Sequence, residues 1–260
     1  MIVVQITDTH ITAPGRRIAG GIDTAPALTR CVDAVNALDP QPDVVVMSGD
    51  LVDSGRREDY EHLRRLLAPL RAPVHLLPGN HDKREPLCEV FGDLAYLPAA
   101  GPLDHVVDDF PLRLVCMDTS VPGAVHGELD REALQWLDRC LGNAATRPTM
   151  VFLHHPPFAT GIAAMDDSRL RNSDDLAEVL GRHPQVLHVA CGHVHRAIHT
   201  RWHGIPASIA PSPSHAVALD LRAAADPAVL LEPGAFHVHV WHPDPGPWGA
   251  IVTHIAYSGS

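Results

Sequence analysis

The feature that most constrains the fold is a pattern that recurs five times: an apolar run of strand length, followed at once by a turn that carries Asp, His or Asn. The runs, such as Val44-Val-Val-Met47, are apolar on both faces, which is typical of strands in a sheet that helices cover. Leu28, Cys31, Val32 and Val35 recur at helical spacing between two of these runs. The alternation of strand and helix predicts an α/β fold.

The polar turns are expected to lie together. In α/β sheets, ligands bind outside the carboxyl ends of the strands, so turns at these ends converge on one place. Glycines before Asp50, Asn80 and His193 permit tight turns and close backbone approach. The five turns are Asp8-Thr-His10, Gly49-Asp50, Gly79-Asn-His-Asp82, His154-His155 and Gly192-His-Val-His195.

The chemistry of these turns indicates divalent transition metals. Imidazole suits Zn, Fe, Ni or Cu, and carboxylate or carbonyl oxygen suits Mn or Mg. The absence of thiolate argues against a structural zinc site of the cysteine type. Asp-x-His and His-x-His each place two side chains on one side of an extended segment. Seven candidate ligands are too many for one ion and suit two.

In this order, D-x-H, GD, GNHD, a strand-end His and GHxH resemble the calcineurin-like metallophosphoesterase superfamily. The motifs extend from Asp8 to His195, about three-quarters of the chain. The segments SGDLVDSGR, LPGNHD, HHPP and CGHVH resemble bacterial class III cyclic-nucleotide phosphodiesterases and their glycerophosphodiesterase relatives. The expected fold is a single domain over residues 1–260, a four-layer αββα sandwich of two mixed sheets flanked by helices.

The resemblance implies a ligand set for two ions. One ion would be held by Asp8, His10 and His195, the other by Asn80, His154 and His193, and Asp50 would bridge both. His155 is the alternative to His154.

Further roles concern the substrate. His81 would be catalytic together with Asp50, facing the phosphoryl group, and Asn80 would also contact the substrate. His215 follows a Pro-rich turn where relatives bring a loop toward the substrate, so a substrate role and a structural role both stay open. Asp82 is expected to be a turn residue or to orient His81 rather than to bind metal.

Charge limits the partners. The chain has 20 Lys and Arg against 31 Asp and Glu, a formal net charge of −11, which disfavours long nucleic acid and anionic membranes. Two metal ions, drawn from Mn²⁺, Fe²⁺ or Fe³⁺, Zn²⁺ and Co²⁺, would add +4 when both are divalent, against −2 from Asp8 and Asp50. About +2 would then attract a small phosphodiester. A hydroxide formed from bound water would attack phosphorus in line, and His81 would protonate the leaving group or stabilise the developing charge.

The leading function is a phosphodiesterase acting on 3′,5′-cyclic nucleotides, cAMP or cGMP, and the alternative is the same chemistry on glycerophosphodiesters. A phosphoprotein phosphatase is disfavoured because that branch has GNHE where this chain has GNHD, and a pair of phosphate-binding arginines that is not evident here. A non-catalytic scaffold on the same fold is disfavoured because such proteins lose ligands, whereas the full set is present.

Other segments are less specific. Residues from about 205 to 260 are expected to complete the second sheet and, through Phe236, Val238 and Val240, to offer a homodimer surface. His237 and His239 alternate on one strand face and His242 follows; a solvated or interface face is favoured over a second metal site. Arg16 and Arg17 are expected on a solvated loop, with contact to a substrate anion as the alternative.

The cysteines and the apolar runs of the chain bear on the cellular location of the protein. The five cysteines form an odd set without C-x-x-C spacing, which is typical of a reducing cytoplasm. The first residues lack the basic region of a secretory signal, and no apolar run reaches the roughly 18 residues that span a membrane. A cytoplasmic enzyme is therefore expected.

Overall fold

The computed structural model describes residues 1–98 and 100–259, which form two mixed sheets. In the first sheet, with order β13-β12-β1-β2-β3, the strands β1, β2 and β3 are parallel, and β12 and β13 are antiparallel to their neighbours. Its strands are β1 (Ile2–Ile6), β2 (Val44–Ser48), β3 (Val74–Leu77), β12 (Ala235–His242) and β13 (Ala250–Tyr257).

The second sheet has the order β4-β5-β6-β7-β9-β8, with antiparallel strands at its edges and parallel strands between them. Its strands are β4 (His105–Val107), β5 (Arg113–Cys116), β6 (Thr149–Phe152), β7 (Val186–Cys191), β8 (Ile198–Trp202) and β9 (Ile205–Ile209).

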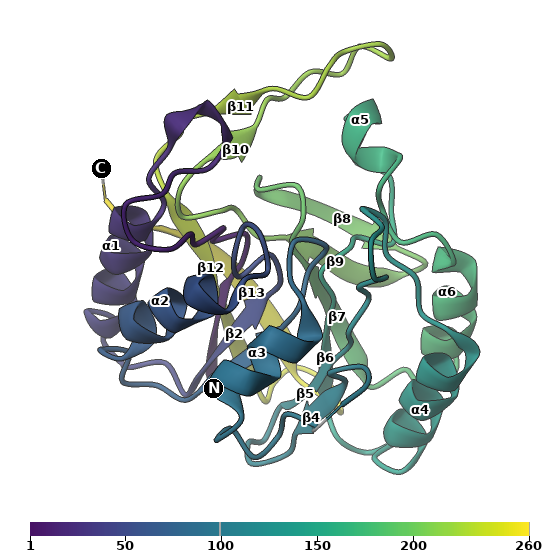
Figure 1. The fold of residues 1–260 in the computed structure, drawn as a ribbon. Coiled ribbons are helices and arrows are strands. Elements are labelled where there is room, and N and C mark those ends of the chain that lie inside the picture. Colours follow the sequence, from purple (N-terminus) through teal and green to yellow (C-terminus); the bar gives the residue numbers. More distant parts are fainter. Residues whose placement is uncertain (99, 260) are drawn as a thin grey trace.

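Helices cover the outer face of each sheet, as Figure 1 shows. The first sheet carries α1 (Ala25–Asn36), α2 (Arg57–Leu67) and α3 (Arg84–Phe91), and the second carries α4 (Arg131–Gly142) and α6 (Ser173–Gly181). Short elements lie outside these layers: η1 (Ala19–Gly21), α5 (Ala163–Asp166), β10 (Ala216–Val217) and β11 (Val229–Leu230). The expected four-layer αββα sandwich is confirmed.

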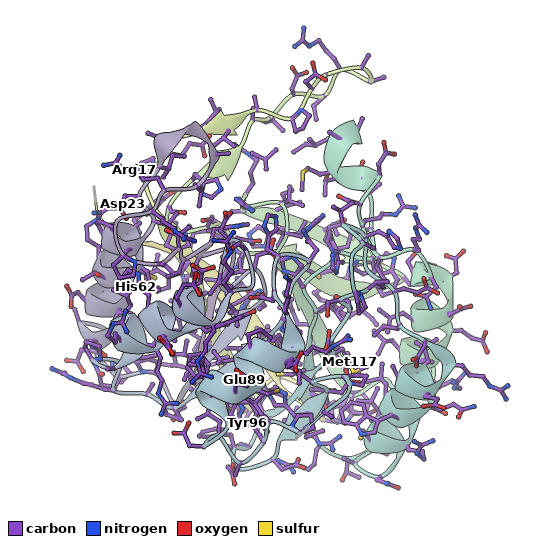
Figure 2. The ribbon with its side chains drawn as sticks, in the orientation of Figure 1. Arg17, Asp23, His62, Glu89, Tyr96 and Met117 are labelled. Carbon is purple, nitrogen blue, oxygen red and sulfur yellow. The ribbon has the colours of Figure 1, made fainter. Side chains whose placement is uncertain are left out.

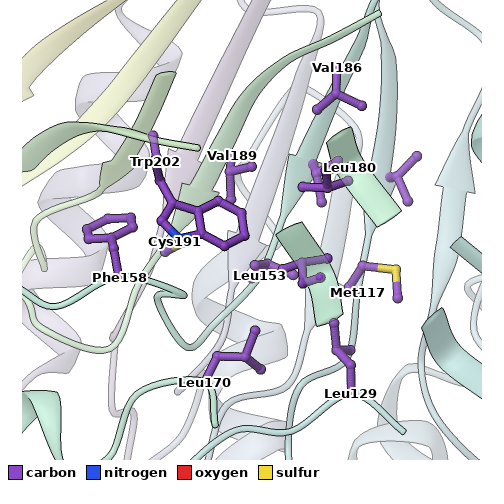
Figure 3. Close-up of a cluster of buried hydrophobic side chains, with 14 of the residues drawn as sticks. Met117, Leu129, Leu153, Phe158, Leu170, Leu180, Val186, Val189, Cys191 and Trp202 are labelled. Atoms are coloured by element: carbon purple, nitrogen blue, oxygen red, sulfur yellow. The ribbon is translucent and has the colours of Figure 1, made fainter. Parts of the chain in front are cut away.

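Three apolar cores hold these layers together. Leu63 of α2 and Met47 of β2 are buried in the core under the first set of helices. Leu137 of α4 packs with Val151 of β6 under the second set, in the core that Figure 3 draws. Between the sheets, Val46 meets Phe152 and other side chains of a third core. Because both faces of the central strands are covered, their sequences are apolar throughout.

One end of the space between the sheets is polar. We call it the inter-sheet polar cluster; it comprises Gln5, Ser48, His188, Ser208, His237 and His239, all buried. The expectation that His237 and His239 lie on a solvated or interface face is therefore wrong, since both are 0% exposed. Strand β12 lies between β1 and β13 in the first sheet. One of its faces packs in the core under the helices, and the face that carries His239 meets Phe152 and His188 of the second sheet. His242, at the end of β12, is exposed.

The expectation for residues 205–260 needs correction. Strand β9 joins the second sheet, but β12 and β13 extend the first sheet, because β12 pairs with β1. Phe236 and Val238 are 1% and 8% exposed in the core under the helices, so these two side chains cannot form a dimer surface. Among the described residues, no helix has the length and apolar character needed to cross a bilayer.

Candidate dinuclear metal site

The five polar turns meet at the carboxyl ends of the parallel strands of both sheets. Asp8 and His10 follow β1, Asp50 follows β2, and Asn80 and His81 follow β3. From the second sheet, His154 follows β6, and His193 and His195 follow β7. Of these side chains, those of Asn80 and His81 reach solvent, and the other six are buried. The convergence predicted from the turns is confirmed.

A first cluster consists of Asp8, His10, Asp50 and His195, each of which offers one ligand atom within 4.8 Å of all the others. His10 Nε2 lies 3.6 Å from Asp50 Oδ2, and His195 Nε2 lies 3.4 Å from Asp8 Oδ1. The two imidazole Nε2 atoms are 3.2 Å apart. This cluster joins three residues of the first sheet to one residue of the second.

A second cluster lies on the other side of Asp50. His154 Nε2 is 3.4 Å from Asp50 Oδ2 and 3.2 Å from Asn80 Oδ1. The His193 ring lies 5.2 Å from the His154 ring, centre to centre. The same oxygen of Asp50 therefore faces His10 in one cluster and His154 in the other, while its Oδ1 accepts a hydrogen bond from the His81 backbone N–H at 2.9 Å.

The neighbours His154 and His155 differ in what they contact. The Nδ1 of His154 lies 2.9 Å from the Ser48 carbonyl oxygen, which can only accept. His154 Nδ1 therefore carries the hydrogen, and Nε2 presents its lone pair to Asp50 and Asn80 in the neutral ring. His155 instead places Nδ1 2.8 Å from Thr119 Oγ1, although its ring also lies near His193. The contacts with Asp50 and Asn80 favour His154 as the ligand, and His155, which offers a ligand atom within 4.8 Å of those of His154 and His193, stays the alternative.

The backbone is strained at the ligand positions. Asp8, His10, Asp50, His193 and His195 have φ between 44° and 74°, the left-handed region that side chains disfavour. The turn before Asp50 also needs Gly49, because a Cβ there would lie 2.3 Å from His154 Nδ1. Such strain persists where surrounding structure holds it, and it clusters at functional sites.

The electrostatics of the site reflect its buried carboxylates. Burial would lower the pKa of His154, but the carboxylates of Asp50 and Asp8 outweigh burial and raise it to about 9. Burial would likewise raise the pKa of Asp50, but the imidazole of His154 holds it well below its ordinary value. In contrast, burial and the His154 charge lower the pKa of His193 to about 3.

These residues fit divalent ions. Asp50 Oδ2, Asn80 Oδ1 and the Nε2 atoms of His10, His154 and His195 lie 3.2–3.6 Å from their neighbours in the two clusters, and positive charge among them would be stabilised. Protons on the rings can supply it, as the raised pKa of His154 indicates, and so can metal ions. The mixed nitrogen and oxygen set suits Mn²⁺, Fe²⁺, Co²⁺ or Zn²⁺.

Two supporting residues were not predicted from the sequence. Asp53 Oδ1 lies 3.4 Å from His10 Nδ1, and the Asp53 carbonyl oxygen accepts from His81 Nδ1 at 2.8 Å. Ser168 Oγ lies 2.8 Å from His193 Nε2. Asp53 follows Asp50 by three residues in SGDLVDSG, which is a signal that could have pointed to it.

Asp82 has the turn role expected of it but does not hold His81. Its carboxylate accepts from the backbone N–H of Gly79 at 2.8 Å and of Leu51 at 3.0 Å, and from the Tyr60 hydroxyl at 2.9 Å. Asp82 thereby ties the turn after β3 to the turn after β2. The His81 ring is oriented through the Asp53 carbonyl instead.

The open side of the site carries the residues expected to meet substrate. The exposed His81 ring lies 4.6 Å from the His10 ring, centre to centre. A cavity of about 490 Å³ adjoins this side. Its lining includes Asn80, His81, Lys83, Arg84 and residues 120–123. His215 is buried, with its ring 4.5 Å from the His195 ring, and lines a separate cavity of about 260 Å³.

Arg16 and Arg17 lie on the solvated loop that was predicted. Arg16 Nη1 is 3.6 Å from Glu58 Oε1, with both side chains about half exposed. Arg17 donates to the Gly21 carbonyl at 2.8 Å and lies at the outer surface of the loop before α1 (Figure 2). Their side chains thus contact this loop and α2.

Known proteins share this sequence and this fold. Residues 1–197 match the family of calcineurin-like phosphoesterases. The probable glycerophosphodiester phosphodiesterase GpdQ of Arcobacter nitrofigilis is 38% identical over 100% of this chain and 94% of its own length. The 3′,5′-cyclic adenosine monophosphate phosphodiesterase CpdA of Escherichia coli is 33% identical over 78% of this chain and 72% of its own.

A solved structure shows the same fold at low sequence identity. A dimetal phosphatase from Danio rerio is 15% identical, has a TM-score of 0.67, and is matched over 99% of this chain and 96% of that one. The family match covers about three-quarters of the chain, and the first relative covers all of it. The chain therefore belongs to the calcineurin-like phosphoesterase family.

Proposed function

We propose that the chain is a phosphodiesterase that hydrolyses small phosphodiesters with the help of two divalent metal ions. The observation that carries the proposal is the single oxygen of Asp50 that faces both donor clusters, at 3.6 Å from His10 and 3.4 Å from His154. A carboxylate oxygen shared between two sets of ligands suits a pair of ions about 3.5–4 Å apart.

The ligands of each ion follow from the two clusters. Asp8, His10, Asp50 and His195 would hold one ion. Asn80, Asp50, His154 and His193 would hold the other. Mn²⁺, Fe²⁺ or Fe³⁺, Co²⁺ and Zn²⁺ are the candidate metals. When bound, the ions would supply the Lewis acidity that activates water and neutralises phosphoryl oxygens.

His81 would donate a proton to the leaving group. Its Nδ1 faces the Asp53 carbonyl oxygen at 2.8 Å, and a carbonyl only accepts, so Nδ1 keeps a hydrogen. The exchangeable proton is then the one on Nε2. A protonated His81 would donate it to the leaving alkoxide oxygen. Asn80 and His215, on either side of the clusters, would orient the phosphoryl oxygens.

Two substrate classes are proposed. The names of several relatives support 3′,5′-cyclic nucleotides, among them cAMP phosphodiesterase CpdA. The relative that matches the whole chain is named a probable glycerophosphodiester phosphodiesterase, which supports glycerophosphodiesters. The cavity beside His81 would receive the part of either diester beyond the phosphoryl group.

A substrate panel tests the proposal. Protein stripped with EDTA and reloaded with Mn²⁺ or Co²⁺ is assayed on cAMP, glycerophosphocholine, bis(p-nitrophenyl) phosphate and p-nitrophenyl phosphate. We expect EDTA to abolish activity, added metal to restore it, and kcat/KM to favour diesters over the monoester. The ratio of the two natural diesters then selects the substrate class. Higher kcat/KM on the monoester, or intact diesters throughout, would contradict the proposal.

Location and assembly complete the proposal. We place the enzyme in the cytoplasm because all five cysteines are unpaired. A homodimer would form through β13, the outer strand of the first sheet, which exposes Val252, Ile255 and Tyr257 at 44%, 40% and 64%. A single monomer-sized elution peak over a wide range of protein concentrations would rule the dimer out.

A further inference from the structure

A network of hydrogen bonds connects the two sheets directly behind the two clusters of proposed ligands. Gln5 Nε2 lies 2.8 Å from Ser48 Oγ in the first sheet and 2.9 Å from the Cys191 carbonyl oxygen in the second. Gln5 Oε1 lies 3.1 Å from His239 Nε2, and His239 Nδ1 lies 2.8 Å from Thr253 Oγ1. Gln5, Ser48 and His239 are completely buried.

The direction of each hydrogen bond in this network is fixed. The Cys191 carbonyl can only accept, so the amide nitrogen of Gln5 must face it, and Oε1 must face His239. His239 therefore donates from Nε2–H, and its Nδ1 accepts from the Thr253 hydroxyl. A flipped Gln5 amide would set two oxygens against each other at Cys191. The network thus holds the amide in one orientation.

Gln5 contacts the two strands at the residues just before their ligand turns. Ser48 is followed by Gly49 and Asp50, and Cys191 is followed by Gly192 and His193. The strand ends are so close here that a Cβ on Gly192 would lie 2.0 Å from Thr7 Oγ1 and 3.1 Å from the Ser48 carbonyl oxygen. The same Ser48 carbonyl accepts from His154 Nδ1 at 2.9 Å.

Each proposed ion takes ligands from both sheets. The first would bind Asp8, His10 and Asp50 of the first sheet and His195 of the second. The second would bind Asn80 and Asp50 of the first sheet, and His154 and His193 of the second. The distance between the sheets at this end therefore sets the distances between ligands.

We propose that Gln5, held by His239, is a positioning residue that fixes the spacing between the Asp50 turn and the His193–His195 turn, so that affinity for the two ions depends on its amide. The inference rests on the proposed two-ion site. Gln5 touches neither substrate nor metal; it acts through the strand ends that carry the ligands. The proposal also assigns a function to His239, one of the two buried histidines of β12.

The test is a Co²⁺ titration of metal-free protein, followed by visible absorption, for wild type, Gln5→Met and Gln185→Met. Gln185 is a matched control: its side chain is 1% exposed and its Nε2 donates to the Leu141 carbonyl at 3.0 Å, at the opposite end of β7 from the ligands. Gln5→Met loses three buried hydrogen bonds and Gln185→Met loses one, so both should lower Tm, Gln5→Met by more.

The two variants are expected to differ in metal binding. Gln5→Met should weaken Co²⁺ binding about 10- to 100-fold, the usual cost of losing a residue that orients ligands, and Gln185→Met should leave it unchanged. At saturating Co²⁺, kcat of Gln5→Met should recover toward wild type with KM unchanged. Equal Co²⁺ affinity of Gln5→Met and Gln185→Met would overturn the inference.

A second variant covers the case in which Gln5→Met does not fold. His239→Phe removes the partner that anchors Gln5 Oε1, so Co²⁺ affinity should fall in the same direction, by less than in Gln5→Met. Wild-type Co²⁺ affinity in folded His239→Phe would overturn the anchoring by His239. Wild-type protein that binds no Co²⁺ would instead contradict the two-ion site, and with it the premise of the inference.

Discussion

Two buried histidines, one in the proposed metal site and one in the inter-sheet polar cluster, have pKa values shifted in opposite directions. In the proposed metal site, His154 lies beside Asp50 and Asp8, and its pKa is raised to about 9. In the inter-sheet polar cluster, burial and a neighbouring imidazole lower the pKa of His188 to about 4. Its described hydrogen-bond partner is a hydroxyl, that of Ser208, at 2.8 Å. Both imidazoles are buried, so the carboxylates of Asp50 and Asp8 account for the raised pKa of His154.

The largest expected effect comes from removing the Asp50 carboxylate, which lies beside His154. Asp50→Ala should leave less than one ion per chain and lower kcat/KM by more than about 10³-fold, because both clusters lose a shared ligand. Metal analysis of the purified protein and the diester assay measure the two losses. Asp109→Ala, at an exposed aspartate, is the control. Two ions retained in Asp50→Ala would show that Asp50 bridges nothing.

A smaller effect is expected at the exposed edge of the metal clusters. His81→Ala should keep both ions and lower kcat by about 10²–10⁴-fold, since a proton donor is lost but no ligand. His254→Ala, an exposed histidine on β13, is the control. If His81→Ala lost metal but kept its turnover per bound ion, His81 would be a ligand rather than a proton donor.

The smallest expected effect is a pH dependence of stability that arises from the histidines of the inter-sheet polar cluster. Burial lowers the pKa of His188 to about 4 and that of His237 to about 3, so below about pH 6.5 the unfolded chain takes up protons that the folded chain excludes. The free energy of unfolding should therefore fall as pH falls from 6.5 to 4, by about 3 kcal/mol for His188 alone. Urea unfolding in EDTA, repeated across this range, measures it.

A variant isolates one of these titrations. Both ring nitrogens of His237 lack a hydrogen-bond partner in the described structure, so His237→Phe removes a buried titratable group without breaking a hydrogen bond. The imidazoles that face His237, His199 at 5.2 Å and His239 at 5.6 Å, remain in place. His237→Phe should be less sensitive to acid than wild type. An identical pH dependence would show that His237 does not titrate on unfolding.

Much of the metal site could be predicted from the sequence because strand ends are local features. Val44–Met47 followed by Gly49-Asp50 shows where a strand stops and which side chain comes next, and parallel strands end at one edge. The convergence of Asp8, Asp50 and Asn80, which follow three neighbouring strands of one sheet, follows from that alone, whereas the approach of His193 depends on how the second sheet packs on the first. Which residues support the ligands does not follow, because Ser168 comes from a distant loop and reaches His193 only in the folded chain.

Strand pairing could not be predicted in the same way. The pattern around Phe236–His242 marks a strand but carries no information about its neighbour, and the pairing of β12 with β1 joins residues more than 200 positions apart. The error for His237 and His239 has the same origin. An alternation of apolar and polar residues indicates one solvated face, unless a second sheet covers that face with polar groups of its own.

The positive φ angles at Asp8, His10, Asp50, His193 and His195 have a consequence for how such a chain changes over generations. At these positions glycine would relieve the backbone, and asparagine tolerates the left-handed region better than histidine does. Selection for thermal stability alone would therefore move each position away from its present side chain. A sequence that keeps Asp and His there trades stability for chemistry, and a screen that rewards only stable folding would erode the catalytic centre first.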